Sequence, residues 1–150
     1  MAAWDRLASH ARPVDTFQWM HFDVAEGIPW ILPATRELFV PQMVDLERIG
    51  GVSFTKGCYP GQEIVARSQY LGEVKRRLHL GQAPAALDPG APLAGAALVG
   101  PTAGNVVASA PTGDGEFRVL AVIDTETAAG GDVSAPASGT RLAALRRVHA

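Results

Sequence analysis

No other stretch of this 150-residue sequence brings together as many chemically reactive side chains as Lys56-Gly57-Cys58-Tyr59-Pro60-Gly61-Gln62-Glu63. It holds the only cysteine of the chain. A nearby cation or a helix N-terminus stabilises a thiolate, and Lys56 lies two residues before Cys58. The glycines and Pro60 predict a tight turn, with the proline in the first turn of a helix. The stretch therefore predicts a reactive or ligand-contacting Cys58, against the commoner alternative of a buried, inert thiol.

A helix is expected to follow this turn, from Gln62 to Leu71, because Gly72 would end it. Glu63 and Arg67 are four residues apart in the order that favours an ion pair. The alternative is that Gln62, Glu63 and Arg67 face a site at the start of the helix.

Basic residues are concentrated around this helix. Residues 56–77 contain five basic and two acidic residues, in a chain with a net charge of −2. This asymmetry suits an anionic ligand such as a polyglutamate tail, a phosphate or an RNA backbone. A solvated charged face is an equal alternative.

The composition is typical of a globular protein, with 47% apolar and 19% charged residues. The net charge argues against a general nucleic-acid or membrane-surface protein. No apolar run approaches the ~20 residues that span a bilayer. A single cysteine allows no internal disulfide, and the four histidines are too scattered for metal-ligand spacing. We therefore expect a cytoplasmic protein with no membrane partner and no metal site.

The chain before the basic segment predicts a helix over residues 1–11 and an aromatic-rich strand over residues 17–24, whose apolar side chains are expected in the core. Three prolines exclude a long regular element between residues 27 and 41. Trp30 and Phe39 in this segment could stack on a planar ligand or simply anchor the loop.

The second half predicts several short strands separated by turn clusters, which is typical of a small antiparallel barrel or sandwich. Residues 84–95 are expected to be a connector, and residues 140–149 could instead form a helix. The expected strands are 75–80, 96–99, 105–110, 117–123 and 142–148.

The central stretch closely resembles the signature of the YgfZ family of folate-binding proteins, which are relatives of the glycine-cleavage T-protein, an aminomethyltransferase. The resemblance continues through Val65-Ala66-Arg67 and Gly72-Glu73-Val74-Lys75-Arg76. Upstream it includes Gly27-Ile28-Pro29, the run from Glu37 to Gln42, and Gly51-Val52-Ser53-Phe54. It is dense from about residue 17 to residue 80.

This resemblance implies an α+β fold, with part of the central folate-binding domain of an aminomethyltransferase-like protein over residues 1–74 and a small antiparallel β-barrel over residues 75–150. It implies tetrahydrofolate as the ligand, and iron–sulfur enzymes or their assembly factors as partners. Cys58 would be the critical thiol, with Lys56 beside it. The residues implied in folate binding are Tyr59, Gly61, Gln62, Glu63 and Arg67.

Two departures from the family pattern bear on ligand binding. Ala25 stands where bacterial members commonly have an arginine, so any ligand contact of that arginine is lost. Members of the family are also about twice as long, and we expect this chain to begin within the central domain, with an incomplete folate site.

Three functions follow as hypotheses. The first is a folate-binding accessory protein of iron–sulfur cluster assembly or repair, which supports tRNA modification indirectly and is not a classical enzyme. The second is an aminomethyltransferase of the glycine-cleavage type. The third is a non-enzymatic module that binds RNA through the basic segment.

Overall fold

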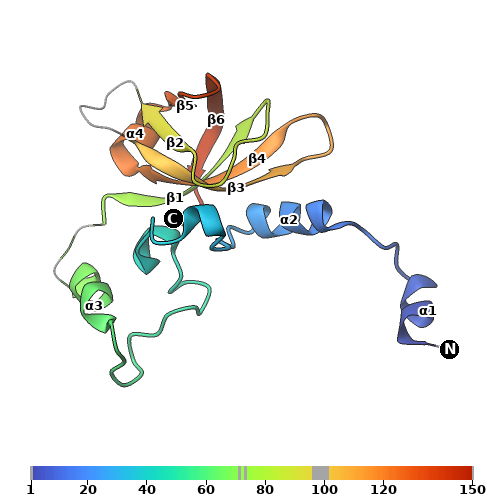
Figure 1. Cartoon of the computed structure of the whole chain (residues 1–150), viewed down its shortest axis with the longest axis horizontal. Coiled ribbons are helices and arrows are strands. Elements are labelled where there is room, and N and C mark those ends of the chain that lie inside the picture. The colour runs from blue at the N-terminus through green and yellow to red at the C-terminus, as the bar shows by residue number, and fades with distance from the viewer. Residues whose placement is uncertain (1, 71, 73, 96–101, 150) are drawn as a thin grey trace.

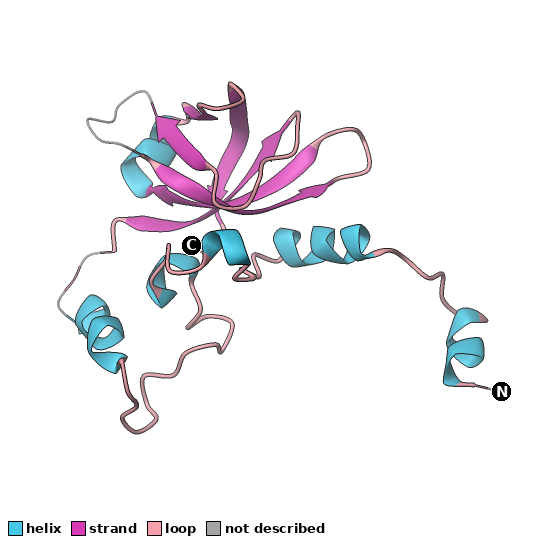
Figure 2. Ribbon diagram, viewed as in Figure 1, coloured by secondary structure: helices cyan, strands magenta, loops and turns pink. Residues whose placement is uncertain are grey.

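The barrel predicted from the second half of the sequence is present. The computed structural model describes residues 2–70, 72, 74–95 and 102–149. Within these residues the strands close an antiparallel barrel in the order β1-β4-β3-β2-β5-β6 (Figures 1 and 2). The strands are β1 (Arg76–Ala83), β2 (Pro92–Gly95), β3 (Gly104–Pro111), β4 (Phe117–Asp124), β5 (Val133–Ala135) and β6 (Thr140–Arg147).

Helices and long loops make up the first half of the chain. In Figure 1, α2 and the short helical turns lie along one side of the barrel, whereas α1 stands at the end of an extended arm. No helix in the described part of the chain is long and apolar enough to cross a membrane. The helices are α1 (Ala3–Ala8), α2 (Thr16–Ala25), the 3₁₀ helices η1 (Pro33–Thr35) and η2 (Pro41–Val44), α3 (Gln62–Tyr70) and α4 (Thr125–Gly130).

Strand β4 explains why the core has two parts. Its residues alternate between the two faces of the sheet. Val119, Ala121 and Ile123 belong to the cluster that fills the barrel. Leu120 and Val122 belong to a second cluster, which also contains Val24 of α2 and Val44 of η2. The barrel wall is thus apolar on both sides, because the helical layer covers its outer face.

The strand predicted over residues 17–24 is wrong, because this segment forms helix α2. Asp15 caps the helix by accepting a hydrogen bond from the Gln18 N–H at 2.8 Å. Its aromatic residues are not in the core: Phe17, Trp19 and Phe22 are more than half exposed. The alternation of aromatic and polar residues favoured a strand. The side chains of α2 that pack against the barrel, Met20 and Val24, are instead four residues apart, as in a helix.

Gly27 ends α2 and joins it closely to the barrel. It adopts a left-handed conformation with φ +73°, and the Ile28 N–H donates to the Asp23 carbonyl at 2.8 Å, as in a Schellman motif. A Cβ at this position would lie 2.1 Å from the Val148 side chain. Both the backbone angle and the close contact therefore require glycine.

Several further expectations are confirmed or corrected. The helix predicted over residues 1–11 is confirmed but is shorter, and the helix that starts at Gln62 is confirmed as far as Tyr70. The segment 84–95, expected to be a connector, contains strand β2. Residues 140–147 form strand β6, so the helix considered for residues 140–149 is wrong. The strand expected at 96–99 lies outside the described residues. The α+β class and the barrel are confirmed; the aminomethyltransferase-like origin and the domain boundary near residue 74 stay predictions.

Candidate functional site

The motif around Cys58 lies in an exposed loop that leads into α3, drawn below the barrel in Figure 1. The thiol is free and exposed, so the alternative of a buried cysteine is excluded. A ligand or a protein partner could reach it directly.

The turn between Cys58 and α3 is held by local contacts. The Tyr59 N–H donates to Gln62 Oε1 at 3.1 Å, and the Gln62 N–H donates back to the Tyr59 carbonyl at 3.3 Å. The Lys56 ammonium lies 4.7 Å from the centre of the Tyr59 ring, within the range of a cation–π interaction. Lys56 is thus oriented by the motif itself.

Pro60 lies before the helix that follows the motif. Pro60 was expected in the first helical turn, but α3 starts at Gln62, and Gly61 precedes it with φ +81°. Pro60 therefore belongs to the turn, and Cys58 lies four residues before the helix.

The charged residues of the motif helix do not form the expected pair. Both Glu63 and Arg67 are exposed, and the ion pairs found within 4.0 Å among the described residues do not include them. Arg76 and Arg77 are used internally: Arg76 Nη2 donates to the Thr102 carbonyl, and Arg77 Nη1 to the Gln42 carbonyl, each at 2.9 Å. The basic segment therefore does not present all its cations to solvent.

An apolar groove lies between α2 and the loop that follows it. It has a volume of about 230 Å³ and is walled by Trp19 and Trp30. Trp30 Nε1 donates to Asp23 Oδ2 at 2.8 Å, which fixes the edge of the indole ring. Each tryptophan is about 60% exposed, so part of each indole ring remains accessible to a ligand. The rest of the lining is Thr16, Met20, Val24, Ile28, Leu32 and Ala108.

Sequence reasoning found only half of this groove. The sequence predicts Trp30 as a candidate for stacking on a planar ligand, but it predicts Trp19 in a strand with its side chain in the core. Helical spacing of Trp19 and Asp23, four residues apart, was the signal that could have found it. Phe39, the other stacking candidate, packs against the core cluster under the helical layer.

A buried carboxylate that the sequence analysis did not identify lies where the helical layer meets the barrel. Asp45 is 1% exposed, and its Oδ1 lies 3.7 Å from Arg77 Nη1 and 4.0 Å from Arg147 Nη2. Neither carboxylate oxygen has a hydrogen-bond partner among the described residues. Burial raises the pKa of Asp45, and the charge of Arg147 opposes that rise. Burial likewise lowers the pKa of the neighbouring His79.

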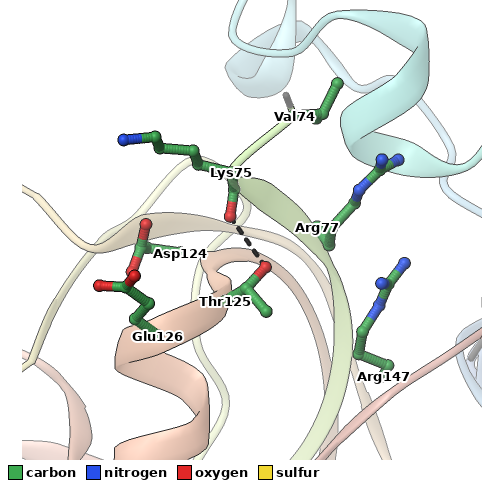
Figure 3. A pocket seen from close by; sticks show the side chains of 7 residues that line it. All are labelled: Val74, Lys75, Arg77, Asp124, Thr125, Glu126 and Arg147. Atoms are coloured by element: carbon green, nitrogen blue, oxygen red, sulfur yellow. Dashed lines mark hydrogen bonds between the residues drawn. The ribbon is translucent and has the colours of Figure 1, made fainter. Parts of the chain in front are cut away.

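The two arginines also line a cavity of about 460 Å³ beside this carboxylate. Figure 3 shows Arg77 and Arg147 on one side of the cavity and the carboxylates of Asp124 and Glu126 on the other. Between them the Thr125 hydroxyl donates to the Lys75 carbonyl at 2.8 Å. Charges of both signs line the walls, so the cavity is not a site for a simple anion. In the residues that the structure covers, no group of three or more His, Cys, Asp or Glu side chains could hold a metal ion.

The structure thus separates the predicted site residues into two places. Lys56, Cys58 and Tyr59 lie in the exposed loop, whereas Trp30 lies in the groove beside α2. Among the described residues, the side-chain hydrogen bonds of the loop remain within residues 53–62.

Known proteins resemble about half of this chain. A tRNA-modifying protein YgfZ of Edwardsiella ictaluri is 49% identical over 72 residues, which are 48% of this chain and 22% of that protein. Proteins of the same name from Yersinia pestis and Yersinia pseudotuberculosis are 44% identical over 75 residues, which are 50% of this chain and 23% of each relative. The matched segment therefore spans less than a quarter of these relatives. No family model matches the chain.

Proposed function

We propose that this chain takes part in tRNA modification as a tetrahydrofolate-binding accessory protein. Its similarity to the curated relatives supports membership of the YgfZ family. The printed name of the relatives supports the link to tRNA modification. The folate part has its own support in the geometry of the groove. Through the exposed thiol of Cys58, the protein would act on iron–sulfur enzymes or their assembly factors.

The observation that supports folate binding is the groove between Trp19 and Trp30. Two exposed indole rings beside an apolar floor suit the stacking of a flat heterocycle. Asp23 adds a nearly buried carboxylate, an acceptor suited to the ring N–H donors of a pterin. At about 230 Å³ the groove is smaller than the usual pocket for a drug-sized ligand, so it would hold one ring system and leave the glutamate tail in solvent.

The Cys58 loop supplies the second part of the proposed function. Its thiol is free, and a protein partner could approach it from solvent. A thiolate is the common protein ligand of iron–sulfur clusters, so this loop could contact a client during cluster assembly or repair. Lys56 and Tyr59 would orient the loop by their cation–π contact.

Titration of tetrahydrofolate into the protein, followed by calorimetry and tryptophan fluorescence, tests the folate part. Replacing Trp30 or Trp19 by alanine is expected to weaken binding about fivefold to a hundredfold, because stacking on an aromatic side chain contributes about 1–3 kcal/mol. Trp4→Ala is the matched control, since Trp4 is equally exposed but lies in α1, away from the groove. Absence of binding to the unaltered chain, or an equal loss in all three variants, would contradict folate binding in this groove.

Cys58→Ala separates the two parts of the proposal. The thiol lies outside the groove, so this variant is expected to bind tetrahydrofolate normally but to fail to restore tRNA thiomethylation in cells that lack their own YgfZ protein. Normal restoration by Cys58→Ala would contradict a role for the thiol.

A further inference from the structure

A buried side chain of η2 connects α3, the helix that follows the Cys58 motif, to the rest of the molecule. Gln42 is 1% exposed, and its Nε2 donates to the carbonyl oxygen of Val65 in α3 at 2.6 Å. The two residues are 23 positions apart in the sequence. The hydrogen bond therefore holds α3 against η2, which is distant from it in the sequence.

The same residue is also tied to the barrel. The main-chain carbonyl of Gln42 accepts a hydrogen bond from Arg77 Nη1 of β1 at 2.9 Å. Hydrogen bonds to a charged donor are stronger than neutral ones. A continuous path of hydrogen bonds thus runs from α3 through Gln42 to the barrel wall.

Helix α3 has little apolar packing that could replace this connection. Ile64 and Tyr70 are 66% and 71% exposed, and no apolar side chain of α3 belongs to either core cluster. Because hydrophobic stabilisation scales with the apolar area removed from water, the placement of α3 depends more on its polar contacts than the barrel does.

We propose that Gln42 is a positioning residue, which sets the place of the Cys58 motif relative to the barrel by holding α3. The proposal rests on the proposed function, in which the motif carries the chemistry. Gln42 acts through the helix and has no contact with the thiol in this assignment.

Hydrogen exchange of a Gln42→Met variant tests the connection without any ligand. Methionine has a similar length but no N–H donor, and the change also removes Gln42 Oε1, a buried acceptor with no partner among the described residues. The amides of α3 are expected to exchange about five- to tenfold faster, the effect of one hydrogen bond of ordinary strength. The amides of β3 and β4 are expected to remain protected. Gln82→Met, at an exposed position of β1, is the matched control and should change neither region.

A probe on the motif distinguishes positioning from simple stabilisation. Cys58 is the only cysteine, so a nitroxide label attached to it reports on the loop without other substitutions. The label is expected to broaden the amide signals of residues 42–44 in the unaltered protein and to lose much of this effect in Gln42→Met. A residue that only stabilises the fold would lower the melting temperature and leave the pattern of broadening unchanged.

The exchange and broadening measurements test the role of Gln42 without any folate present. Unchanged exchange in α3, or unchanged broadening, would overturn it. If Gln42→Met also exposes the amides of β3 and β4, Gln42→Leu is the second variant, because it likewise removes the N–H donor and adds no charge at this buried position. Loss of barrel protection in both variants would make Gln42 a core residue and overturn the proposal. Failure of the unaltered chain to bind tetrahydrofolate would contradict the proposed function but not this role of Gln42.

Discussion

The barrel and the motif segment, residues 53–70, differ in how much apolar surface they bury. In β4 the five residues from 119 to 123 are all 1% exposed or less, whereas no apolar side chain of the motif segment is fully buried. The barrel also closes on itself through its strand pairing, and α3 packs mainly against η2. The side chains with the most reactive chemistry therefore lie in the part with the least packing, as is common for binding loops on a rigid scaffold.

The largest effect of a substitution is expected in the barrel wall. Leu120→Ala removes a side chain that is fully buried between β4 and the helical layer. It is expected to lower the free energy of unfolding by about 2–5 kcal/mol, measured by urea denaturation followed by circular dichroism. A loss below about 1 kcal/mol would mean that the barrel wall is not the stabilising part of the molecule.

A smaller, pH-dependent effect is expected at Asp45, where the helical layer meets the barrel. Burial raises the pKa of this carboxyl above its ordinary value of 3.8. A raised pKa in the folded state stabilises the protonated form, so its contribution to stability is present at low pH and is lost as the pH rises from 3.8 through the raised value. The unfolding free energy of the unaltered protein, relative to Asp45→Asn, should therefore fall over this range. Urea titrations at several pH values measure the difference, and a rise with pH would contradict the assignment.

The smallest effect is expected on the exposed side of α3. Ile64→Ser changes a side chain that is 66% exposed, so it should alter the free energy of unfolding by no more than about 0.5 kcal/mol. The measurement is the same urea titration used for Leu120→Ala. A loss comparable to that of Leu120→Ala would show that the motif segment is packed as tightly as the barrel.

Elements with one dominant local signal could be predicted from the sequence. The apolar runs that became β1, β3 and β4 lie between turn clusters, and α3 follows the Pro60-Gly61 turn and ends near Gly72. Strand β2 was missed, because Pro92 and Gly95 have the composition of a connector. Its pairing with β3 and β5 is a tertiary contact that no local pattern reveals.

The candidate site was only partly predictable for a similar reason. The motif from Lys56 to Glu63 is contiguous, so its chemistry can be recognised without the fold. The groove requires Trp19 and Trp30 to meet across a bend of the chain, and the pattern around Trp19 favoured a strand. The burial of Asp45 and Gln42 could not be recognised from the sequence, because their roles depend on packing against β1 and on Arg77.

By itself, the sequence determined the motif with its single cysteine, the strong resemblance to one family, and an α+β chain with short strands in its second half. Only the tertiary structure decided that Cys58 is exposed, that residues 16–25 form a helix over the barrel, and that Gln42 connects the motif helix to β1. The physical reason is that motifs and turns depend on neighbours along the chain. Exposure, helix packing and buried hydrogen bonds depend instead on residues brought together from far apart.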